Sequence, residues 1–331
     1  MAIRVIVVGA GPIGLGVARD VAARPSLELV AVVDLDPSKT GTVEGLPVTI
    51  DLPKLEPHAG PMVAALTTTS SLAKLEPLAL ECIARGMHVV STCEELAWPW
   101  GTATDLRNGC DAIAHRIDDA AKAMGVCVLG TGVNPGFLMD ALPLALTAPC
   151  RRVERVRVER VQDASIRRRP FQDKVGVGMN KDDVEPRLRA RLLGHVGLQE
   201  SARMISARLG FDIDYFAEDL LVITADTEID LFSTTGRIVR AGEVLGVEQI
   251  GRAFKDGNVK VELFFRATFG QLDPHDRIVI EGDPPLDVSI KGGVPGDTAT
   301  CAIVANAIPV LLLARPGLRT MSDVPLVVWS R

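Results

Sequence analysis

The stretch Gly9-Ala10-Gly11-Pro12-Ile13-Gly14 decides the fold of this chain, because it stands between the β-branched run IRVIVV at 3–8 and the helical stretch LGVARDVAA. A GxGxxG turn between a strand and a helix is typical of the dinucleotide-binding βαβ unit. Its first glycine permits the sharp turn, and its second lets backbone amides approach a pyrophosphate at the helix amino terminus. Asp34 ends the next apolar run, 20 residues beyond Gly14, where a carboxylate can accept hydrogen bonds from an adenosine ribose. The predicted cofactor-binding residues are Gly9, Gly11, Pro12, Ile13, Gly14 and Asp34.

The choice between NAD and NADP depends on the charge beside the ribose. Asp34 would repel the 2′-phosphate of NADP, so it favours NAD. Lys39 is close enough in the sequence to leave NADP open. A glycine turn in an unrelated α/β protein is the simpler alternative for the whole motif, but the order of strand, turn, helix and acidic residue argues against it.

Length and composition limit the classes of protein. A chain of 331 residues, of which 47% are hydrophobic, is long enough for about two domains with their own cores. The net charge of -6 is spread along the chain without a basic tail, and aromatic residues make up only 4%. We therefore expect a small-molecule substrate and no nucleic-acid partner.

The amino terminus and the cysteine spacing indicate the compartment in which the protein works. The apolar amino terminus breaks at Gly9, too early for a transmembrane helix, and it lacks the charged start and cleavage site of a signal peptide. The six cysteines form no CxxC pair and no metal-ligand spacing. We expect a cytoplasmic protein with reduced thiols, no membrane association and no metal site.

Two kinds of strand pattern divide the chain. Up to residue 144, short β-branched runs alternate with helical stretches, as in a parallel sheet with crossover helices. From 145 to 296, runs such as VERVRVERV alternate apolar and polar residues, which predicts a mostly antiparallel sheet with one solvated face. We predict an α/β protein with a doubly wound Rossmann domain at 1–144, a second α+β domain at 145–296, and a helical segment at 297–331 that packs back on the first domain.

Hydroxyl side chains follow two of the predicted parallel strands. Doubly wound sheets bind ligands in the crevice at the carboxyl ends of their strands, so we expect some of these hydroxyls to line the cofactor. A polar turn before the next helix is the simpler alternative. The residues concerned are Thr67, Thr68, Thr69, Ser70 and Thr92.

Two adjacent carboxylates, Glu94 and Glu95, follow the run HVVST and precede Trp98 and Trp100. An ionised glutamate beside apolar surface is costly unless it is paired or hydrogen-bonded. The pair is therefore either a solvated helix start or a working acid and base near the nicotinamide. Alternation along the strand would place Glu94 on the side of Thr92, which favours Glu94 slightly and leaves Glu95 open.

Several other residues are weaker candidates. Asn134 lies in a turn after the last predicted parallel strand and could contact the nicotinamide, or it could serve the turn alone. Trp98 and Phe137 could form apolar walls of a substrate pocket, or they could belong to the core. His195 could form a hydrogen bond with the substrate or with the glutamate, although a lone histidine beside apolar residues is more often structural. The basic run at 167–169 could bind a phosphate or a carboxylate, but such runs are usually solvated.

The chain carries five longer motifs: STCEELAWPW at 91–100, GTGVNPGFLMD at 130–140, RRRPFQDKVGVG at 167–178, GHVGLQESA at 194–202 and GDTATCAIVANAIP at 296–309. Together they resemble the family of 2,4-diaminopentanoate dehydrogenases and the related native amine dehydrogenases. The resemblance implies the dihydrodipicolinate reductase architecture, with a sheet-based second domain that often mediates dimerisation, and hence a homodimer. It implies NAD(P)-dependent oxidative deamination of a primary amine to a ketone or aldehyde, reversible as reductive amination with ammonia. It also implies that a glutamate in the segment after the strand HVVST is catalytic.

The chemistry of deamination agrees with a glutamate in that place. Hydride leaves the amine-bearing carbon only when the lone pair of the nitrogen is free. One carboxylate can take a proton from the ammonium, stabilise the iminium ion and activate the water that attacks it.

The start of the last helix departs from the reductase pattern. Dihydrodipicolinate reductases carry a His-His-x-x-Lys cluster and a Gly-Thr helix start that bind substrate carboxylates, whereas this chain lacks the cluster and reads Gly296-Asp297. Asp297 is a good helix cap and would repel a carboxylate, so we expect it beside an uncharged or cationic substrate. The alternatives are a 2,4-diaminopentanoate dehydrogenase proper, a reductase of a cyclic imine or unsaturated acid, and a nucleotide-sensing protein without turnover.

Overall fold

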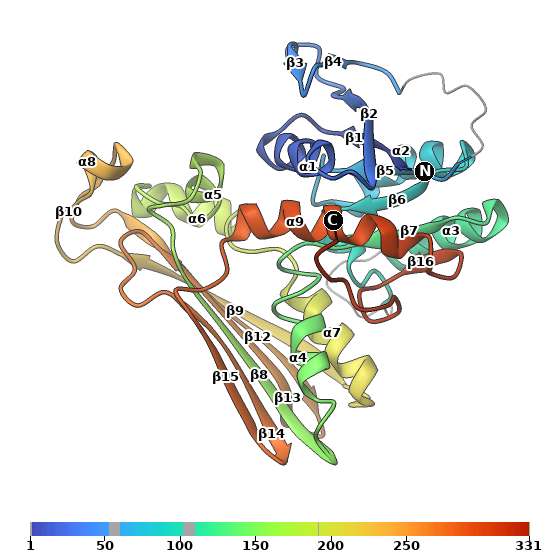
Figure 1. The fold of residues 1–331 in the computed structure, drawn as a ribbon. Helices are drawn as coiled ribbons and strands as arrows, with labels where there is room; N and C mark the ends of the chain where they lie inside the picture. The colour runs from blue at the N-terminus through green and yellow to red at the C-terminus, as the bar shows by residue number, and fades with distance from the viewer. Residues whose placement is uncertain (1, 53–59, 102–109, 191, 331) are drawn as a thin grey trace. The chain divides into compact units, whose positions relative to one another are not determined.

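A computed structural model describes residues 2–52, 60–101, 110–190 and 192–330 (Figure 1). The chain forms two compact units, and each is described by itself. The first unit holds Met1–Ala141 and Pro295–Arg331, and the second holds Leu142–Val294. The sequence predicted that the chain passes from one domain to the other near residues 145 and 297.

The first unit is built on an eight-stranded sheet in the order β16-β7-β6-β5-β1-β2-β4-β3. Its pairs are parallel except for β3 with β4. All residues of β5 are buried, as expected for a parallel sheet covered on both faces. The strands are β1 (Ile3–Val8), β2 (Leu27–Val33), β3 (Thr42–Val43), β4 (Leu46–Thr49), β5 (Met62–Leu66), β6 (His88–Ser91), β7 (Cys127–Gly130) and β16 (Gly317–Arg319).

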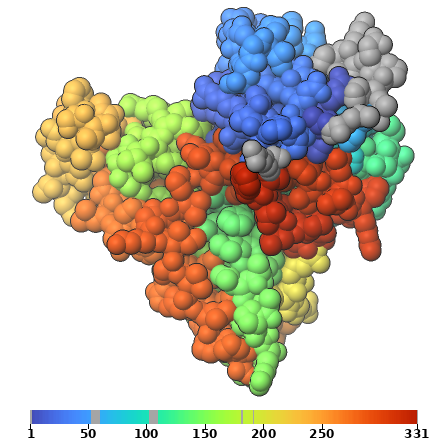
Figure 2. All heavy atoms as spheres, in the orientation of Figure 1, coloured from blue at the N-terminus to red at the C-terminus, as the bar shows by residue number. Residues whose placement is uncertain are grey.

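Helices cover this sheet and bring the carboxyl-terminal segment onto it. The helix α9 packs against α1, and a Cβ on Gly16 would overlap the sulfur of Cys301, so glycine is required where the two helices meet. Figure 2 shows the red carboxyl-terminal segment against the blue amino-terminal one. The helical elements are α1 (Pro12–Ala22), α2 (Leu72–Ala84), the 3-10 helix η1 (Glu94–Leu96), α3 (Cys110–Met124), α4 (Ala141–Leu146, across the unit boundary) and α9 (Gly296–Leu311).

The second unit is built on a six-stranded sheet in the order β15-β14-β8-β13-β12-β9, in which only β8 and β13 pair in parallel. Its strands are β8 (Arg152–Asp163), β9 (Tyr215–Thr224), β12 (Val244–Lys255), β13 (Asn258–Thr268), β14 (His275–Asp283) and β15 (Leu286–Lys291). The remaining elements are α5 (Arg169–Lys174), α6 (Lys181–Arg189), α7 (Leu198–Leu209), β10 (Ile229–Asp230), α8 (Phe232–Thr235) and β11 (Ile238–Val239).

The helix α7 packs on one face of this sheet. A Cβ on Gly251 of β12 would lie 3.3 Å from Cβ of Leu198, the first residue of α7, so Gly251 faces that helix. Buried and charged residues alternate along β8, and the valines Val156 and Val158 are fully buried. The predicted fold class, a Rossmann-like sheet with a second, mostly antiparallel sheet, is confirmed.

Within the described residues, no helix has the length and apolar character needed to cross a membrane.

Candidate active site

The glycine turn between β1 and α1 contains glycines of two kinds. Gly9 has a φ of +105°, and a Cβ there would lie 2.8 Å from the Thr67 carbonyl oxygen, while a Cβ on Gly14 would overlap the carbonyl oxygen of Gly9. These two glycines are explained by packing within the chain. A Cβ on Gly11 would meet nothing within 4 Å. Gly11 is also the N-cap of α1 and has no side chain to cap its amides, so the open space at this helix start fits the approach of a pyrophosphate.

Asp34 stands at the end of β2 and is fixed beside the glycine turn. Its Oδ2 accepts a hydrogen bond from the Ala10 amide at 2.7 Å, and its Oδ1 accepts one from the Asp36 amide at 3.0 Å. The ammonium of Lys39 lies 3.5 Å from Oδ2. Burial alone would raise the pKa of the Asp34 carboxyl, but these amides and Lys39 outweigh it and hold that pKa below its usual value. An ionised carboxylate is therefore held beside the glycine turn.

The hydroxyls after β5 mainly support the turns. Thr67 donates from Oγ1 to the carbonyl oxygens of Gly9 at 3.0 Å and of Val8 at 3.1 Å, so it braces the glycine turn. Thr69 accepts a hydrogen bond from the Ser71 amide at 3.1 Å. Thr68 is exposed and Ser70 is half-buried at the same sheet edge.

The segment after β6 corrects one step of the sequence prediction. The strand ends at Ser91, and Glu94 is the first residue of η1, so the period of two does not extend from Thr92 to Glu94. Placing Glu94 by strand alternation is therefore wrong. The Ser91 hydroxyl donates to the Leu66 carbonyl and accepts from the Cys93 amide, which fixes the start of the turn to the end of β5. Glu94 is half-buried in that turn.

Glu95 is bound to the start of a neighbouring helix. Oε2 of Glu95 accepts a hydrogen bond from the Leu72 amide at 2.7 Å, and the thiol of Cys110 lies 3.9 Å from the same oxygen. Leu72 is the first residue of α2, so Glu95 serves the start of that helix. This contact could not be predicted from the sequence, because it joins residues 23 positions apart.

The loop after β7 brings Asn134 to the same edge of the sheet. The amide of Asn134 donates from Nδ2 to Sδ of Met139 at 3.0 Å, whereas its Oδ1 is buried without a hydrogen-bond partner in the part of the chain that the structure describes. Thr300 of α9 holds this loop by accepting a hydrogen bond from the Val133 amide at 3.2 Å. Thr300 is a positioning contact that sequence reasoning missed, since nothing local marks it. Phe137 in this loop and Trp98 after η1 are both half-buried.

Asp297 is not the cap of α9. The N-cap is Pro295, and Asp297 lies one residue inside the first turn, so the predicted capping role is wrong. The carboxylate still lies at the positive end of the helix, where an anion is favoured.

His195 and the arginine run belong to the second unit and contact partners there. The buried Gln249 accepts from the His195 amide at 2.7 Å and donates to its carbonyl oxygen at 2.9 Å, and the imidazole stacks on Phe265. The guanidinium of Arg167 donates to Gln162 at 2.8 Å and lies 4.0 Å from the ring centre of Phe171. By contrast, the glycine turn, Asp34, Glu94 and Asn134 all lie in the first unit, at the carboxyl ends of its parallel strands.

Comparison with known proteins decides the family. A family model described as the 2,4-diaminopentanoate dehydrogenase C-terminal domain matches residues 137–329. The chain belongs to the 2,4-diaminopentanoate dehydrogenase family. This family member is 32% identical to the 2,4-diaminopentanoate dehydrogenase of Acetoanaerobium sticklandii over 252 residues, which cover 73% of this chain and 68% of that protein. It is 25% identical to the amine dehydrogenase of Streptomyces virginiae over an alignment of 359 residues, which covers 98% of this chain and 96% of that protein.

Solved structures agree on the fold of this dehydrogenase family member. The amine dehydrogenase from Mycobacterium smegmatis matches with a TM-score of 0.79 and 21% identity over 100% of this chain and 98% of that one. Dihydrodipicolinate reductase from Paenisporosarcina, with dipicolinate bound, matches with a TM-score of 0.50 and 14% identity, over 96% of this chain and 97% of that one. The predicted family resemblance is confirmed, and the protein is a dehydrogenase, an oxidoreductase.

Proposed function

We propose that the protein is an amine dehydrogenase that converts a primary amine to a ketone or aldehyde with release of ammonia, and that it catalyses the reverse reductive amination. The observation that carries this proposal is the position of Glu94, half-buried in the turn after β6 on the sheet edge that also holds the glycine turn. The names of the relatives, 2,4-diaminopentanoate dehydrogenase and amine dehydrogenase, support an amine as the substrate class.

Glu94 serves as the base of this reaction. Its carboxylate takes a proton from the substrate ammonium, which frees the nitrogen lone pair for hydride loss from the neighbouring carbon. NAD held at the helix start of Gly11 would supply the acceptor for that hydride. Glu94 returns that proton to solvent, and its restored negative charge stabilises the iminium ion that remains. The carboxylate then takes a proton from the attacking water, passes it to the amino group, and takes the hydroxyl proton as ammonia leaves and the carbonyl group forms. Trp98 and Phe137 supply apolar walls, and Asn134 offers its buried Oδ1 as an acceptor.

The preferred cofactor is NAD. The helix start at Gly11 would hold the pyrophosphate, and the ionised Asp34 carboxylate would accept hydrogen bonds from the ribose hydroxyls and repel a 2′-phosphate. Lys39, which pairs with Asp34 at 3.5 Å, is the group that would attract such a phosphate. Its pairing with Asp34 lowers that attraction.

The substrate is uncharged or cationic beside the first turn of α9, because Asp297 places an anion there. The 32% identity to a 2,4-diaminopentanoate dehydrogenase supports a second candidate, a carboxylated diamine. Initial rates with cyclohexanone, pentanal, pyruvate and 2-oxopentanoate, each with excess ammonium, separate the two. We expect the uncharged carbonyl compounds to be aminated at least as fast as the oxo acids, and a preference of ~100-fold for the oxo acids, about 2.8 kcal/mol, would favour the second candidate.

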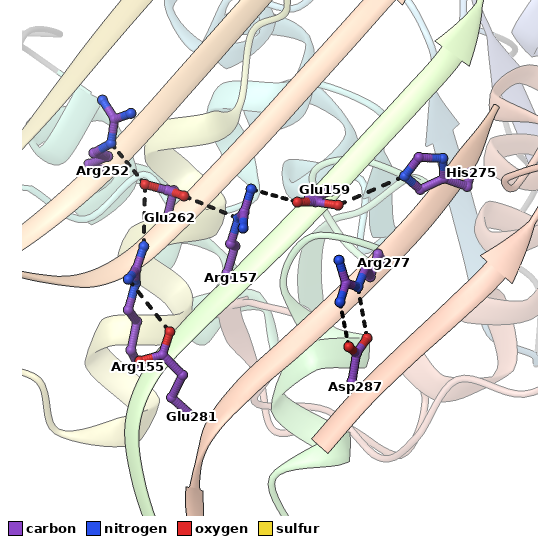
Figure 3. A network of polar contacts seen from close by, with 9 residues as sticks. All are labelled: Arg155, Arg157, Glu159, Arg252, Glu262, His275, Arg277, Glu281 and Asp287. Atoms are coloured by element: carbon purple, nitrogen blue, oxygen red, sulfur yellow. Dashed lines mark hydrogen bonds and ion pairs between the residues drawn. The ribbon is translucent and has the colours of Figure 1, made fainter. Parts of the chain in front are cut away.

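The enzyme is a homodimer that pairs through the charged face of the six-stranded sheet. Gly251 faces α7, so its neighbour Arg252 lies on the opposite face. Figure 3 shows ion pairs there: Glu262 contacts Arg155 at 3.4 Å, Arg157 at 3.2 Å and Arg252 at 2.9 Å.

Charge and area both suit a second copy of the same face. The four arginines and four carboxylates drawn in Figure 3 cancel in charge, so two such faces meet without net repulsion. Six strands spaced ~4.8 Å apart and about ten residues long present on the order of 900 Å². A standard interface buries ~800 Å² per partner.

Dependence on ammonium is the test of the reaction class. The purified protein is mixed with NADH and cyclohexanone, and NADH oxidation is followed with and without ammonium. We expect oxidation only when ammonium is present. Equal rates in both mixtures would identify a carbonyl reductase and contradict the proposal, and absence of oxidation across the four carbonyl compounds would point to a binding protein without turnover.

A further inference from the structure

Glu95 joins two turns at the functional edge of the eight-stranded sheet. It is the middle residue of η1, directly after Glu94, and its Oε2 accepts a hydrogen bond from the Leu72 amide at 2.7 Å. Leu72 begins α2, immediately after the turn that follows β5. The bond therefore fastens the segment that carries Glu94 to a neighbouring strand-to-helix connection.

This bond replaces a local helix cap. The first amides of a helix lack intrahelical partners and usually bind a side chain at the N-cap position. Ser71 occupies that position in α2 with extended backbone angles, but its side chain makes no capping bond, and the first turn of α2 carries no acidic residue. The Glu95 carboxylate, 23 residues away, takes the place of the cap, and its negative charge is favourable at a helix start.

Glu94 is thus held from both sides. On its amino-terminal side, the Cys93 amide donates to the Ser91 hydroxyl at 3.1 Å, and that hydroxyl donates to the Leu66 carbonyl of β5 at 3.0 Å. On its carboxyl-terminal side, Glu95 is bound to α2. A turn of three residues between two such fixed points leaves the Glu94 backbone little freedom.

We propose that Glu95 is a positioning residue, whose bond to the start of α2 fixes η1 and so aims the Glu94 carboxylate, and that only Glu94 exchanges protons with the substrate. The inference rests on the proposed function, since it requires Glu94 to be the base. It assigns to two adjacent glutamates two different tasks.

Replacing glutamate by glutamine removes the negative charge of the side chain but keeps an oxygen that can accept a hydrogen bond. Glu95→Gln keeps an oxygen that can accept from Leu72, so we expect kcat for reductive amination to fall by no more than about fivefold. Glu94→Gln removes the base, and we expect kcat to fall by ~100-fold to 10,000-fold. Loss of turnover in Glu95→Gln, with an unchanged melting temperature, would make Glu95 the base and overturn the proposal.

Removal of the bond tests positioning directly. Glu95→Ala should lower kcat by about 10-fold to 100-fold, because a misplacement of about 1 Å costs rates of this order. The KM for NADH should stay within about threefold, and the melting temperature should fall because α2 loses its cap. Unchanged kcat in Glu95→Ala would overturn the proposal.

The double variant Ser71→Asp/Glu95→Ala distinguishes positioning from stability. A carboxylate at the N-cap restores the start of α2 locally but does not reach η1, so we expect the melting temperature to recover while kcat stays at the level of Glu95→Ala. Recovery of both would show that Glu95 is only a cap and would overturn the proposal.

Glu76→Ala is the matched control on the same helix. It removes the ion pair between Glu76 and Arg116, at 2.5 Å, and should lower the melting temperature without lowering kcat. Full turnover in Glu94→Gln would contradict the proposed function itself, a result that is distinct from every outcome of the Glu95 variants.

Discussion

The two sheets of this protein expose polar groups in opposite ways. The central strand β5 of the eight-stranded sheet is a continuous apolar run, and polar residues such as Asp34, Thr67 and Glu94 follow the carboxyl ends of its parallel strands. In the six-stranded sheet, charged and buried residues alternate along β8 and β13. A sheet buried on both faces can offer a ligand only its edge, whereas an antiparallel sheet with one open face can offer a surface. These properties underlie our proposals that the chemistry takes place at the edge of the first sheet and that subunits associate through the face of the second.

The largest expected effect is at the edge of the first sheet. Glu94→Gln keeps the shape of the side chain but removes the base, so kcat should fall by ~100-fold to 10,000-fold while the dissociation constant for NADH changes by less than about threefold. Steady-state rates and fluorescence titration with NADH measure the two quantities. A variant that keeps more than a tenth of the wild-type rate would remove Glu94 from the mechanism.

The glycine turn offers a second test of the edge. Gly11→Val adds a side chain in open space, so the melting temperature should change little, whereas the affinity for NADH should fall at least about tenfold, or about 1.4 kcal/mol, because the side chain takes the space of the pyrophosphate. Gly14→Ala is the matched control for packing, since its methyl group would overlap the Gly9 carbonyl and lower stability. Unchanged NADH affinity in Gly11→Val would place the cofactor elsewhere.

The face of the second sheet is tested by reversing a charge. Glu262→Arg would put a cation among Arg155, Arg157 and Arg252, and like charges across an interface cost several kcal/mol, so the dimer dissociation constant should rise at least about tenfold. Sedimentation velocity over a concentration series measures it. Glu81→Arg makes the same charge change on an exposed side of α2 and should leave association unaltered. Equal dissociation constants for both variants and the wild type would contradict an interface on this face.

The smallest expected effect concerns the choice of cofactor. Asp34→Ala removes both the ribose acceptor and the charge that repels a 2′-phosphate, so the ratio of kcat/KM for NADH over NADPH should fall about tenfold, or about 1.4 kcal/mol. Lys39→Met in the same background should weaken NADPH again, because it removes the nearby cation. If neither substitution changes the ratio, the ribose does not lie beside Asp34.

The sequence allowed the fold and the glycine turn to be predicted because their causes are local. Gly9 and Gly14 are glycines for steric reasons that act within a few residues or between neighbouring strands, and Asp34 follows at a fixed spacing. The role of Glu95 could not be predicted, since its hydrogen bond to Leu72 joins residues 23 positions apart.

Two local expectations were also wrong for physical reasons. Strand alternation did not extend to Glu94 because β6 ends at Ser91 and a 3-10 turn begins at Glu94. Asp297 is a favourable N-cap residue by type, but the helix already begins after Pro295, which places Asp297 inside the first turn. In both cases the residue type was informative, and the exact boundary of the element decided the outcome.

The central claim, that hydride passes between nicotinamide and the carbon of an amine, is tested most directly by tracing the hydrogen. The protein is incubated with cyclohexanone, excess ammonium and NADH deuterated at both C4 positions, and the products are analysed by mass spectrometry. We predict cyclohexylamine that carries a single deuterium on the carbon bound to nitrogen, and its loss in Glu94→Gln. Deuterated cyclohexanol in place of the amine, or amine without deuterium, would contradict the account.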